Sequence, residues 1–364
     1  ANHVTKQHPD WIRKYGTQTW IDPGNPDARK FVLETMLDVV RRYDVDGIHI
    51  DDYFYPYRES RTITRRVRRK RIRQRVELQF PDDRTWRKYG KAKGWTDRDA
   101  WRRANIDDFV QSLYKGVKAI RPTALVGISP FGIWRSGTPA GVTGLDAFSE
   151  IFADSKRWLG EGWLDYVAPQ LYWQISGTED RFRALDAWWR SENPQRRYVW
   201  PALYTSRVYG NGDSWPASEI EDQVETIRAS RIGTADVPGH VHFRLAALLA
   251  QNSSLGQSLS SDYAERALVP SFPWLGGMTP ASPEVSVVNA EGSASVTVSA
   301  GDSVPVRWWL IQARSRDGKW SSKLRLASAG QAMTESFGAT DPDEVAVTAI
   351  GATGLSSTAT IVAP

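Results

Sequence analysis

The chain has 364 residues, of which 41% are hydrophobic and 24% are charged, so it is long enough for two globular domains. It contains no cysteine, which excludes disulfides, thiol catalysis and cysteine-ligated metal sites. No apolar run approaches the ~20 residues needed to cross a bilayer, so we predict no transmembrane segment. The net charge of +5 depends on residues 61–75, which contain nine Arg or Lys and no acid.

A helix followed by a buried strand is predicted in the first part of the chain. Asp27 is expected to cap the helix, whose apolar residues recur at helical spacing between Phe31 and Val40. The strand covers residues 46–52, and its apolar run ends on two adjacent carboxylates, Asp51 and Asp52. Because α/β enzymes place their chemistry at the carboxyl ends of parallel strands, this doublet predicts a functional site. The alternative is a solvated loop that carries two acids.

A long polar excursion is predicted over residues 58–99, and the Arg-rich segment 61–75 falls within it. We expect this segment to be a solvated or disordered loop. The alternative is attraction to an anionic polymer such as cell-wall glycan or teichoic acid. The segment lacks the amphipathic stripe that is typical of a membrane-surface helix. It also lacks a recognised nucleic-acid-binding motif, so we predict no nucleic-acid partner.

Four more strands are predicted, each preceded by a helix. The helices cover residues 100–120, 148–159, 178–190 and 216–231, and the strands cover residues 124–130, 163–169, 197–203 and 239–244. Such alternation predicts βαβ units on a parallel sheet, and strands that all end on polar or aromatic residues are typical of a (β/α)8 TIM barrel. Because five strands can be counted, we expect the barrel to lack its first three strands in this chain.

The C-terminal part has a different character. Proline and glycine residues gather between positions 270 and 283, and short alternating runs follow at residues 284–289, 293–300, 306–314, 344–350 and 360–363. We therefore predict two domains, a barrel over residues 1–272 and an all-β sandwich over residues 273–364.

Aromatic and hydrogen-bonding residues are frequent at the predicted strand ends. The 17 Trp exceed what the core requires, and flat rings stack well on sugars. The expected ligand-stacking residues are Tyr53, Tyr55, Trp134, Tyr172, Trp173 and Tyr204. Gln170 and Arg135 are expected to bind polar groups of the ligand. The alternative is that some of these rings belong to the core.

Four blocks of sequence resemble the glycosyl-hydrolase-10-like proteins, a bacterial group of exported barrel enzymes. They lie, in the family's order, at residues 22–57, 80–90, 127–137 and 161–173, and the resemblance extends over residues 1 to 272. It implies hydrolysis of glycan strands, as in the members that cut peptidoglycan. The stretch "VAVTAIGATGLSS" at residues 345–357 is similar to the closing strand of a fibronectin type III module.

Glycoside hydrolysis requires two carboxyl groups, one neutral and one ionised. Because side chains alternate along a strand, His49 and Asp51 share one face and Asp52 lies on the other. Asp51 is our first candidate for the chemistry and Asp52 the second, with a buried structural carboxylate as the alternative for Asp52. Asp154 matches a recurring position of the family and is a further candidate. We place His49 among the substrate-binding residues.

We therefore predict a secreted or envelope-associated glycoside hydrolase that acts on a bacterial polysaccharide, with peptidoglycan glycan favoured. The alternatives are a non-catalytic glycan-binding protein and, because three barrel strands are expected to be missing, an inactive fragment. We predict no cofactor and no metal, because His240 and His242, the nearest metal-like pair, are equally explained by alternation on a strand.

Overall fold

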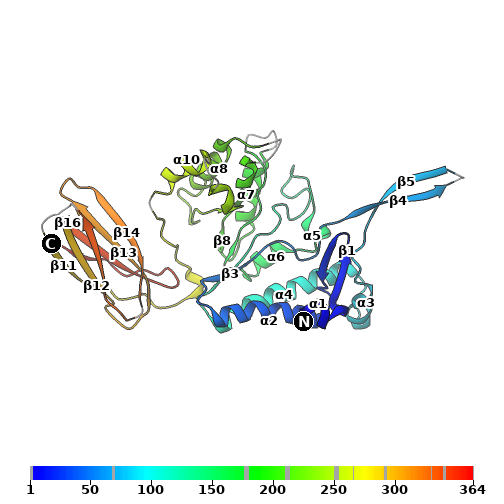
Figure 1. Ribbon diagram of the computed structural model, residues 1–364, viewed down its shortest axis with the longest axis horizontal. Helices are drawn as coiled ribbons and strands as arrows, with labels where there is room; N and C mark the ends of the chain where they lie inside the picture. The colour runs from blue at the N-terminus through cyan, green and yellow to red at the C-terminus, as the bar shows by residue number, and fades with distance from the viewer. Residues whose placement is uncertain are drawn as a thin grey trace. The chain divides into compact units, whose positions relative to one another are not determined.

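The computed structural model describes residues 3–67, 70–175, 180–209, 214–249, 254–264, 266–290, 293–328, 330–338 and 342–363. The chain divides into two compact units, Ala1–Leu255 and Gly256–Pro364, with the expected boundary at residue 272 inside the second (Figure 1). Among the described residues, no helix combines the length and the hydropathy that a bilayer crossing requires.

A parallel sheet forms the centre of the first unit. Its strands are β3 (Gly47–Ile50), β6 (Leu125–Ile128), β7 (Tyr166–Val167) and β8 (Tyr198–Val199), in that order. The pair β9 (Ala202–Leu203) and β10 (Val241–His242) is also parallel, and single bridges join Gln170 to Phe131 and to Ala202. The five strands predicted from the sequence therefore lie side by side in chain order. The fourth is interrupted at Pro201, which has no N–H to donate.

The structure confirms a mixed α/β unit but does not confirm a TIM barrel. In the described part of the chain, β3 and β10 form the two edges of the strand series, and no pairing joins them. Closure into a barrel would require every strand to have two neighbours.

Helices accompany the sheet, and α2 (Pro26–Arg42) packs beside α4 (Arg98–Ile120) (Figure 1). Asn25, not the expected Asp27, caps α2, because its Oδ1 accepts from the N–H of Asp27 at 2.9 Å. The predicted helix at 148–159 is two short helices, α5 (Ala147–Glu150) and α6 (Ser155–Gly160). The remaining helices are α7 (Arg181–Ser191), α8 (Ala217–Ala229), α9 (Leu245–Leu248) and α10 (Ser254–Asp262).

Short helical turns complete the first unit, and one further turn, η5, lies in the second. They are α1 (Val4–Gln7), η1 (Pro9–Trp11), α3 (Asp83–Thr85), η2 (Trp86–Gly90), η3 (Lys91–Lys93), η4 (Thr205–Tyr209) and η5 (Pro273–Leu275).

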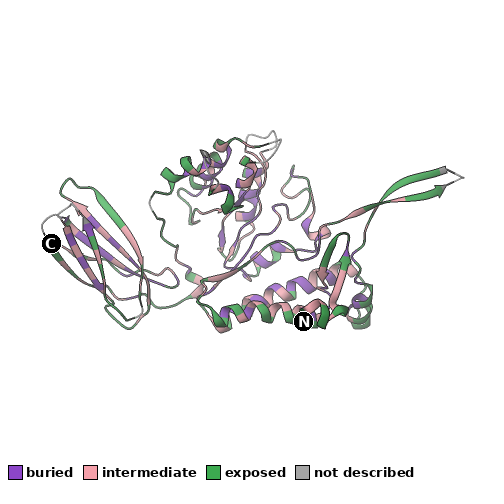
Figure 2. Ribbon diagram, in the orientation of Figure 1, coloured by how far each residue is buried: buried purple, intermediate pink, exposed green. Residues whose placement is uncertain are grey.

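Two hairpins lie outside the parallel sheet. The first pairs β1 (Ile12–Tyr15) with β2 (Gln18–Ile21). The second pairs β4 (Ser60–Val67) with β5 (Lys70–Glu77), so the expectation of a loop over 61–75 is wrong. The β-branched Thr and Ile residues between its arginines fit a pleated ribbon. Most of this hairpin is exposed (Figure 2).

The second unit contains two antiparallel sheets. Strands β11 (Glu284–Ala290), β12 (Ser293–Ser299) and β15 (Met333–Gly338) form one sheet, and β14 (Trp320–Leu326), β13 (Val306–Ser315), β16 (Pro342–Gly351) and β17 (Thr360–Val362) form the other. Buried residues of both sheets, such as Val296 and Trp309, share one core. The sequence analysis missed β14 and β15, because Ser, Lys and Arg interrupt the apolar pattern of β14 and Thr, Glu and Ser interrupt that of β15.

Candidate active site

Asp51 lies immediately after β3, at the carboxyl end of the strand, and its side chain is exposed. Its Oδ1 accepts a hydrogen bond from Nε2 of Gln170 at 3.0 Å and another from the backbone N–H of Asp52 at 2.9 Å. The same Gln170 nitrogen donates to the Ser129 carbonyl at 3.1 Å. Residues that follow β3, β6 and β7 therefore meet at one point, as expected for residues at the carboxyl ends of neighbouring parallel strands.

Asp52 has the opposite environment, since it is 2% exposed. Its Oδ2 accepts a hydrogen bond from the Tyr57 hydroxyl. Burial raises the pKa of Asp52 from 3.8 to about 6; the Tyr57 hydrogen bond opposes this rise and the charge of Asp51 adds to it. The adjacent carboxyl groups thus differ in exposure and in proton affinity, which is how paired carboxyl groups acquire different roles.

His49 is held by two neighbours across the sheet. Its Nε2 lies 2.8 Å from the Ser129 hydroxyl and its Nδ1 lies 3.0 Å from the Tyr166 hydroxyl. Desolvation lowers the pKa of His49, while the charge of Asp51 opposes this effect. Gly127 pairs with both His49 and Tyr166, and a Cβ on Gly127 would lie 2.1 Å from the Tyr166 ring. The missing side chain therefore lets the tyrosine reach across one strand to the histidine.

Aromatic rings form a series beside the two carboxyl groups. Tyr53 lies with its ring centroid 6.4 Å from that of Trp20 and 6.1 Å from that of Tyr57. The series continues from Tyr57 to Phe131 at 6.4 Å and from Phe131 to Trp173 at 6.0 Å. Rings at such distances form a wall on which planar sugar faces could stack.

A second aromatic pair faces the same carboxyl groups. Tyr172 stacks on Tyr204 with a centroid distance of 4.7 Å. The pKa of Tyr172 is raised by burial first and then by the negative charges of Asp51 and Asp52. The structure therefore brings together most of the expected binding residues, namely His49, Tyr53, Gln170, Tyr172, Trp173 and Tyr204.

Tyr55 does not belong to this group. It is 1% exposed and packs edge-on against Phe80 and Phe152, with centroids 5.3 and 5.1 Å away. The expectation that it binds ligand is wrong, because a ring enclosed by core residues cannot reach a ligand.

Trp134, Arg135 and Asp154 form a separate cluster. Trp134 stacks on Trp188 at 6.0 Å and donates from Nε1 to Oδ1 of Asp154 at 3.0 Å. Asp154 occupies the N-cap position of α6, and the Arg135 guanidinium lies 4.9 Å from the centre of the Phe148 ring. Among the described residues, Asp154 bonds to Trp134, and no hydrogen bond or ion pair joins it to Asp51 or Asp52.

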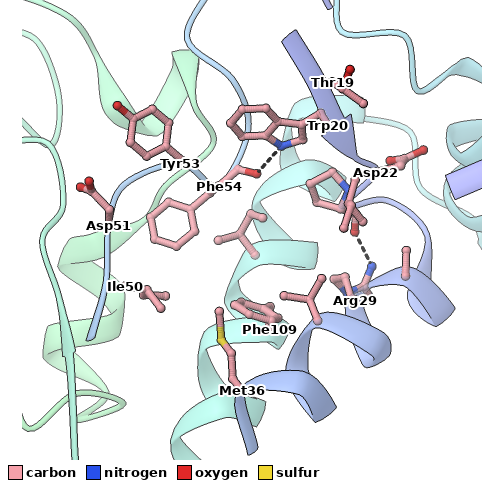
Figure 3. Close-up of a pocket in the computed structure, with 15 residues that line it drawn as sticks. Thr19, Trp20, Asp22, Arg29, Met36, Ile50, Asp51, Tyr53, Phe54 and Phe109 are labelled. Carbon is pink, nitrogen blue, oxygen red and sulfur yellow. Dashed lines mark hydrogen bonds between the residues drawn. The ribbon is translucent and has the colours of Figure 1, made fainter. Parts of the chain in front are cut away.

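A cavity of about 440 Å³ lies between β3 and the helices α2 and α4. Asp51, Tyr53 and Trp20 lie toward one end, and apolar side chains such as Met36 and Phe109 line the other (Figure 3). The largely apolar lining suits packing or a ring-shaped group better than a charged one.

Asp22 also borders this cavity but is already satisfied. It is fully buried, forms a 2.8 Å ion pair with Arg13, and accepts hydrogen bonds from the Thr85 hydroxyl at 2.8 Å and the Gly24 N–H at 2.9 Å. Burial nevertheless raises its pKa. These bonds indicate a structural carboxylate.

The sequence analysis left Tyr57, Ser129, Trp20 and Phe131 out of the site. Ser129 and Phe131 follow β6, so the strand-end rule could have found them. Tyr57 belongs to the aromatic run after Asp52, but its hydrogen bond depends on a turn that spacing does not reveal. Trp20 comes from β2, which lies outside the parallel sheet.

The geometry defines a mixed α/β protein in which carboxyl groups and aromatic rings gather at the carboxyl ends of parallel strands, where α/β proteins place their ligand sites. The model of the family Glycosyl hydrolase-like 10 matches residues 1–208, more than half of the chain. The chain therefore belongs to this family, which confirms the resemblance predicted from the sequence.

Two relatives show how much of a longer protein this chain represents. Glycosyl hydrolase YngK of Bacillus subtilis (strain 168) is 34% identical over 307 residues, covering 81% of this chain and 56% of the relative. Glycosyl hydrolase DigH of Escherichia coli (strain K12) is 36% identical over 208 residues, covering 55% of this chain and 43% of the relative. The chain spans about half the length of these relatives.

Proposed function

We propose that this chain carries the catalytic centre of a glycoside hydrolase that cleaves a bacterial polysaccharide. The observation that carries the proposal is the Asp51–Asp52 pair, one carboxyl group exposed and the other buried, beside a wall of aromatic rings. Family membership and the names of the relatives support the same class of reaction.

In the proposed mechanism, Asp51 acts directly on the glycosidic bond, because it is the exposed member of the pair. Asp52 lies behind it and holds a proton up to a pH of about 6. The proton of the pair passes through Asp51 to the glycosidic oxygen as the bond between that oxygen and the anomeric carbon breaks. A water oxygen then bonds to the anomeric carbon, and the proton that this water loses returns to the pair. Gln170 fixes the orientation of Asp51 through the 3.0 Å hydrogen bond.

The substrate that we favour is the glycan strand of peptidoglycan. The resemblance of the four sequence blocks to enzymes of that kind supports this choice. The aromatic residues and Gln170 offer ring stacking and hydrogen bonds, which suit acetamido sugars. We further propose that the protein acts outside the cytoplasm and that its second unit, with sheets of three and four strands, is a fibronectin type III-like module.

The experiment is to incubate the chain with purified glycan strands and measure new reducing ends. We expect release by the unchanged chain and a loss of about 100-fold or more with Asp51→Asn, a typical cost of removing an acid–base group. Asp154→Asn is the matched control, since it removes a carboxylate from the separate cluster and should retain release.

Two outcomes would contradict the proposal. Tight binding of glycan without release by any variant would favour a non-catalytic glycan-binding protein. Equal loss in Asp51→Asn and Asp154→Asn would show that the Asp51–Asp52 pair has no special role.

A further inference from the structure

The hairpin β4–β5 has two chemically different faces. Directly opposed residues of an antiparallel pair lie on the same face. One face consists of four such pairs, Ser60 with Glu77, Thr62 with Arg75, Thr64 with Arg73, and Arg66 with Arg71. We call Arg66, Arg71, Arg73 and Arg75 the arginine face. The other face pairs Arg61 with Val76, Ile63 with Gln74, and Arg65 with Ile72.

The arginine face presents charge at a regular repeat. Alternate residues of a strand lie about 7 Å apart on one face, so Arg71, Arg73 and Arg75 form a row. Arg66 stands directly opposite Arg71 on the neighbouring strand, about 5 Å away. Like charges in opposed positions destabilise a sheet unless an anion lies between them.

In the hairpin as described, the one acidic residue on this face, Glu77, pairs with Arg58 and with none of these four arginines. All four are exposed, and none of them forms an ion pair with another described residue. Arg75 donates to the Ser60 hydroxyl, and the ion pair at the base of the hairpin joins Arg58 to Glu77 at 3.0 Å. The face is therefore available to an external polyanion.

We propose that the arginine face binds a linear phosphodiester polymer without bases, of the poly(glycerol phosphate) class. Guanidinium groups bind phosphate through two parallel hydrogen bonds, and a row with a repeat of about 7 Å can meet successive charges of an extended chain. Single-stranded nucleic acid requires aromatic platforms for its bases, whereas residues 60–77 contain no aromatic side chain. This proposal concerns attachment to a polymer and is independent of the proposed hydrolysis.

Binding of the full chain to poly(glycerol phosphate) of defined length tests the proposal by titration calorimetry. Two variants remove the same charge from opposite faces of one hairpin, Arg73→Gln/Arg75→Gln and Arg61→Gln/Arg65→Gln. We expect the first to weaken binding about tenfold or more in low salt. Its plot of log affinity against log salt concentration should become shallower by about 1.4, which corresponds to two lost phosphate contacts. The second should change affinity by less than about threefold, because its charges act only at a distance.

Several results would overturn the proposal. They are equal weakening in the two variants, absence of binding by the unchanged chain, and tighter binding to duplex DNA or to anionic lipid vesicles than to poly(glycerol phosphate). Circular dichroism and thermal melting of each variant establish that it is folded. Because binding is measured without a hydrolysis readout, failure here is distinct from failure of the proposed function.

Discussion

Gln170 donates a hydrogen bond from Nε2 to Oδ1 of Asp51 over 3.0 Å, although 119 positions separate the two residues in the chain. The contact exists because β3 and β7 both flank β6, which brings the residues after these strands to the same edge. It joins the exposed carboxylate to a backbone segment that is itself bridged to Phe131 and Ala202. The orientation of Asp51 therefore depends on the sheet and not on its own loop alone.

Replacing Gln170 by Ala should lower kcat/KM for reducing-end release by about 10- to 100-fold. The loss corresponds to one hydrogen bond to a charged group, worth about 1.5–3 kcal/mol. The measurement is steady-state kinetics on purified glycan strands. A conservative Gln170→Glu variant should not restore activity, because its carboxylate repels Asp51. Unchanged kinetics in Gln170→Ala would contradict the positioning role.

Hydrolysis should decline as the pH rises through about 6, where Asp52 loses its proton. The Tyr57 hydrogen bond lowers the pKa of Asp52, so Tyr57→Phe should move this limb of the pH profile to higher pH. The measurement is kcat/KM against pH for both proteins. A limb that stays in place would show that the Asp52–Tyr57 contact does not set the profile.

The free energy of unfolding should also depend on the ionisation of Asp52. Its folded pKa is raised from 3.8 to about 6, so the folded state binds more protons between these values. The stabilisation that protonated Asp52 gives the folded state is therefore complete below about pH 4 and is lost between pH 4 and about pH 6. The free energy of unfolding above pH 6 is lower than that below pH 4 by at most about 3 kcal/mol. The free energies of unfolding of the unchanged chain and of Asp52→Asn, measured by urea titration, should coincide below about pH 4, separate between pH 4 and about pH 6, and stay apart by a constant amount above that, with the variant the more stable. Parallel curves would refute the shift.

Tyr53 and Tyr55 should respond differently to replacement by Ala. Tyr53 is 59% exposed, so its loss should weaken glycan binding by about 0.5–1.5 kcal/mol and leave stability nearly unchanged. Tyr55 is buried, so its loss should destabilise the fold by about 3–5 kcal/mol. Paired titrations with glycan and with urea distinguish the two effects. Similar destabilisation in both variants would contradict the separation.

Asp82 should prove essential for stability. It is fully buried and binds Arg102, with Oδ2 2.8 Å from Nε and Oδ1 2.7 Å from Nη2. Asp82→Asn removes the buried carboxylate that pairs with both Arg102 and Arg98, leaves Arg102 with Asp99 as its acidic partner, and should cost about 3–5 kcal/mol in urea unfolding. The neighbouring Asp83 is largely exposed and pairs with Arg98, so Asp83→Asn should cost less than about 1 kcal/mol. A small effect at Asp82 would show that water reaches Arg102.

The order of the strands could be predicted from the sequence, because the alternation of apolar strands with helices leaves few possible sheet topologies. The functional region was accessible for the same reason, since Asp51, Gln170 and Tyr172 all follow strands. The burial of individual side chains could not be predicted from the sequence in the same way. Strict alternation from β3 would place Tyr53 and Tyr55 on the same side of the chain, and only the packing of Tyr55 against Phe80 and Phe152 distinguishes them.

The hairpin β4–β5 was missed for a different reason. Its arginines interrupt the apolar alternation by which a strand is recognised, while Thr62, Ile63 and Ile72 provide the β-branched character. A strand that projects into solvent has no buried face, so hydrophobic periodicity carries no signal for it. A matching position in a family does not specify which neighbours surround Asp154, so its contact with Trp134 could not be predicted.

The absence of a side chain at position 127 has an evolutionary consequence. A methyl group there would displace the phenol ring of Tyr166 and, with it, one of the two anchors of His49. A larger residue at 127 is compatible only with a smaller one at 166. Positions 127 and 166 are therefore expected to vary in concert among relatives, with the imidazole at 49 retained only where the glycine–tyrosine combination persists.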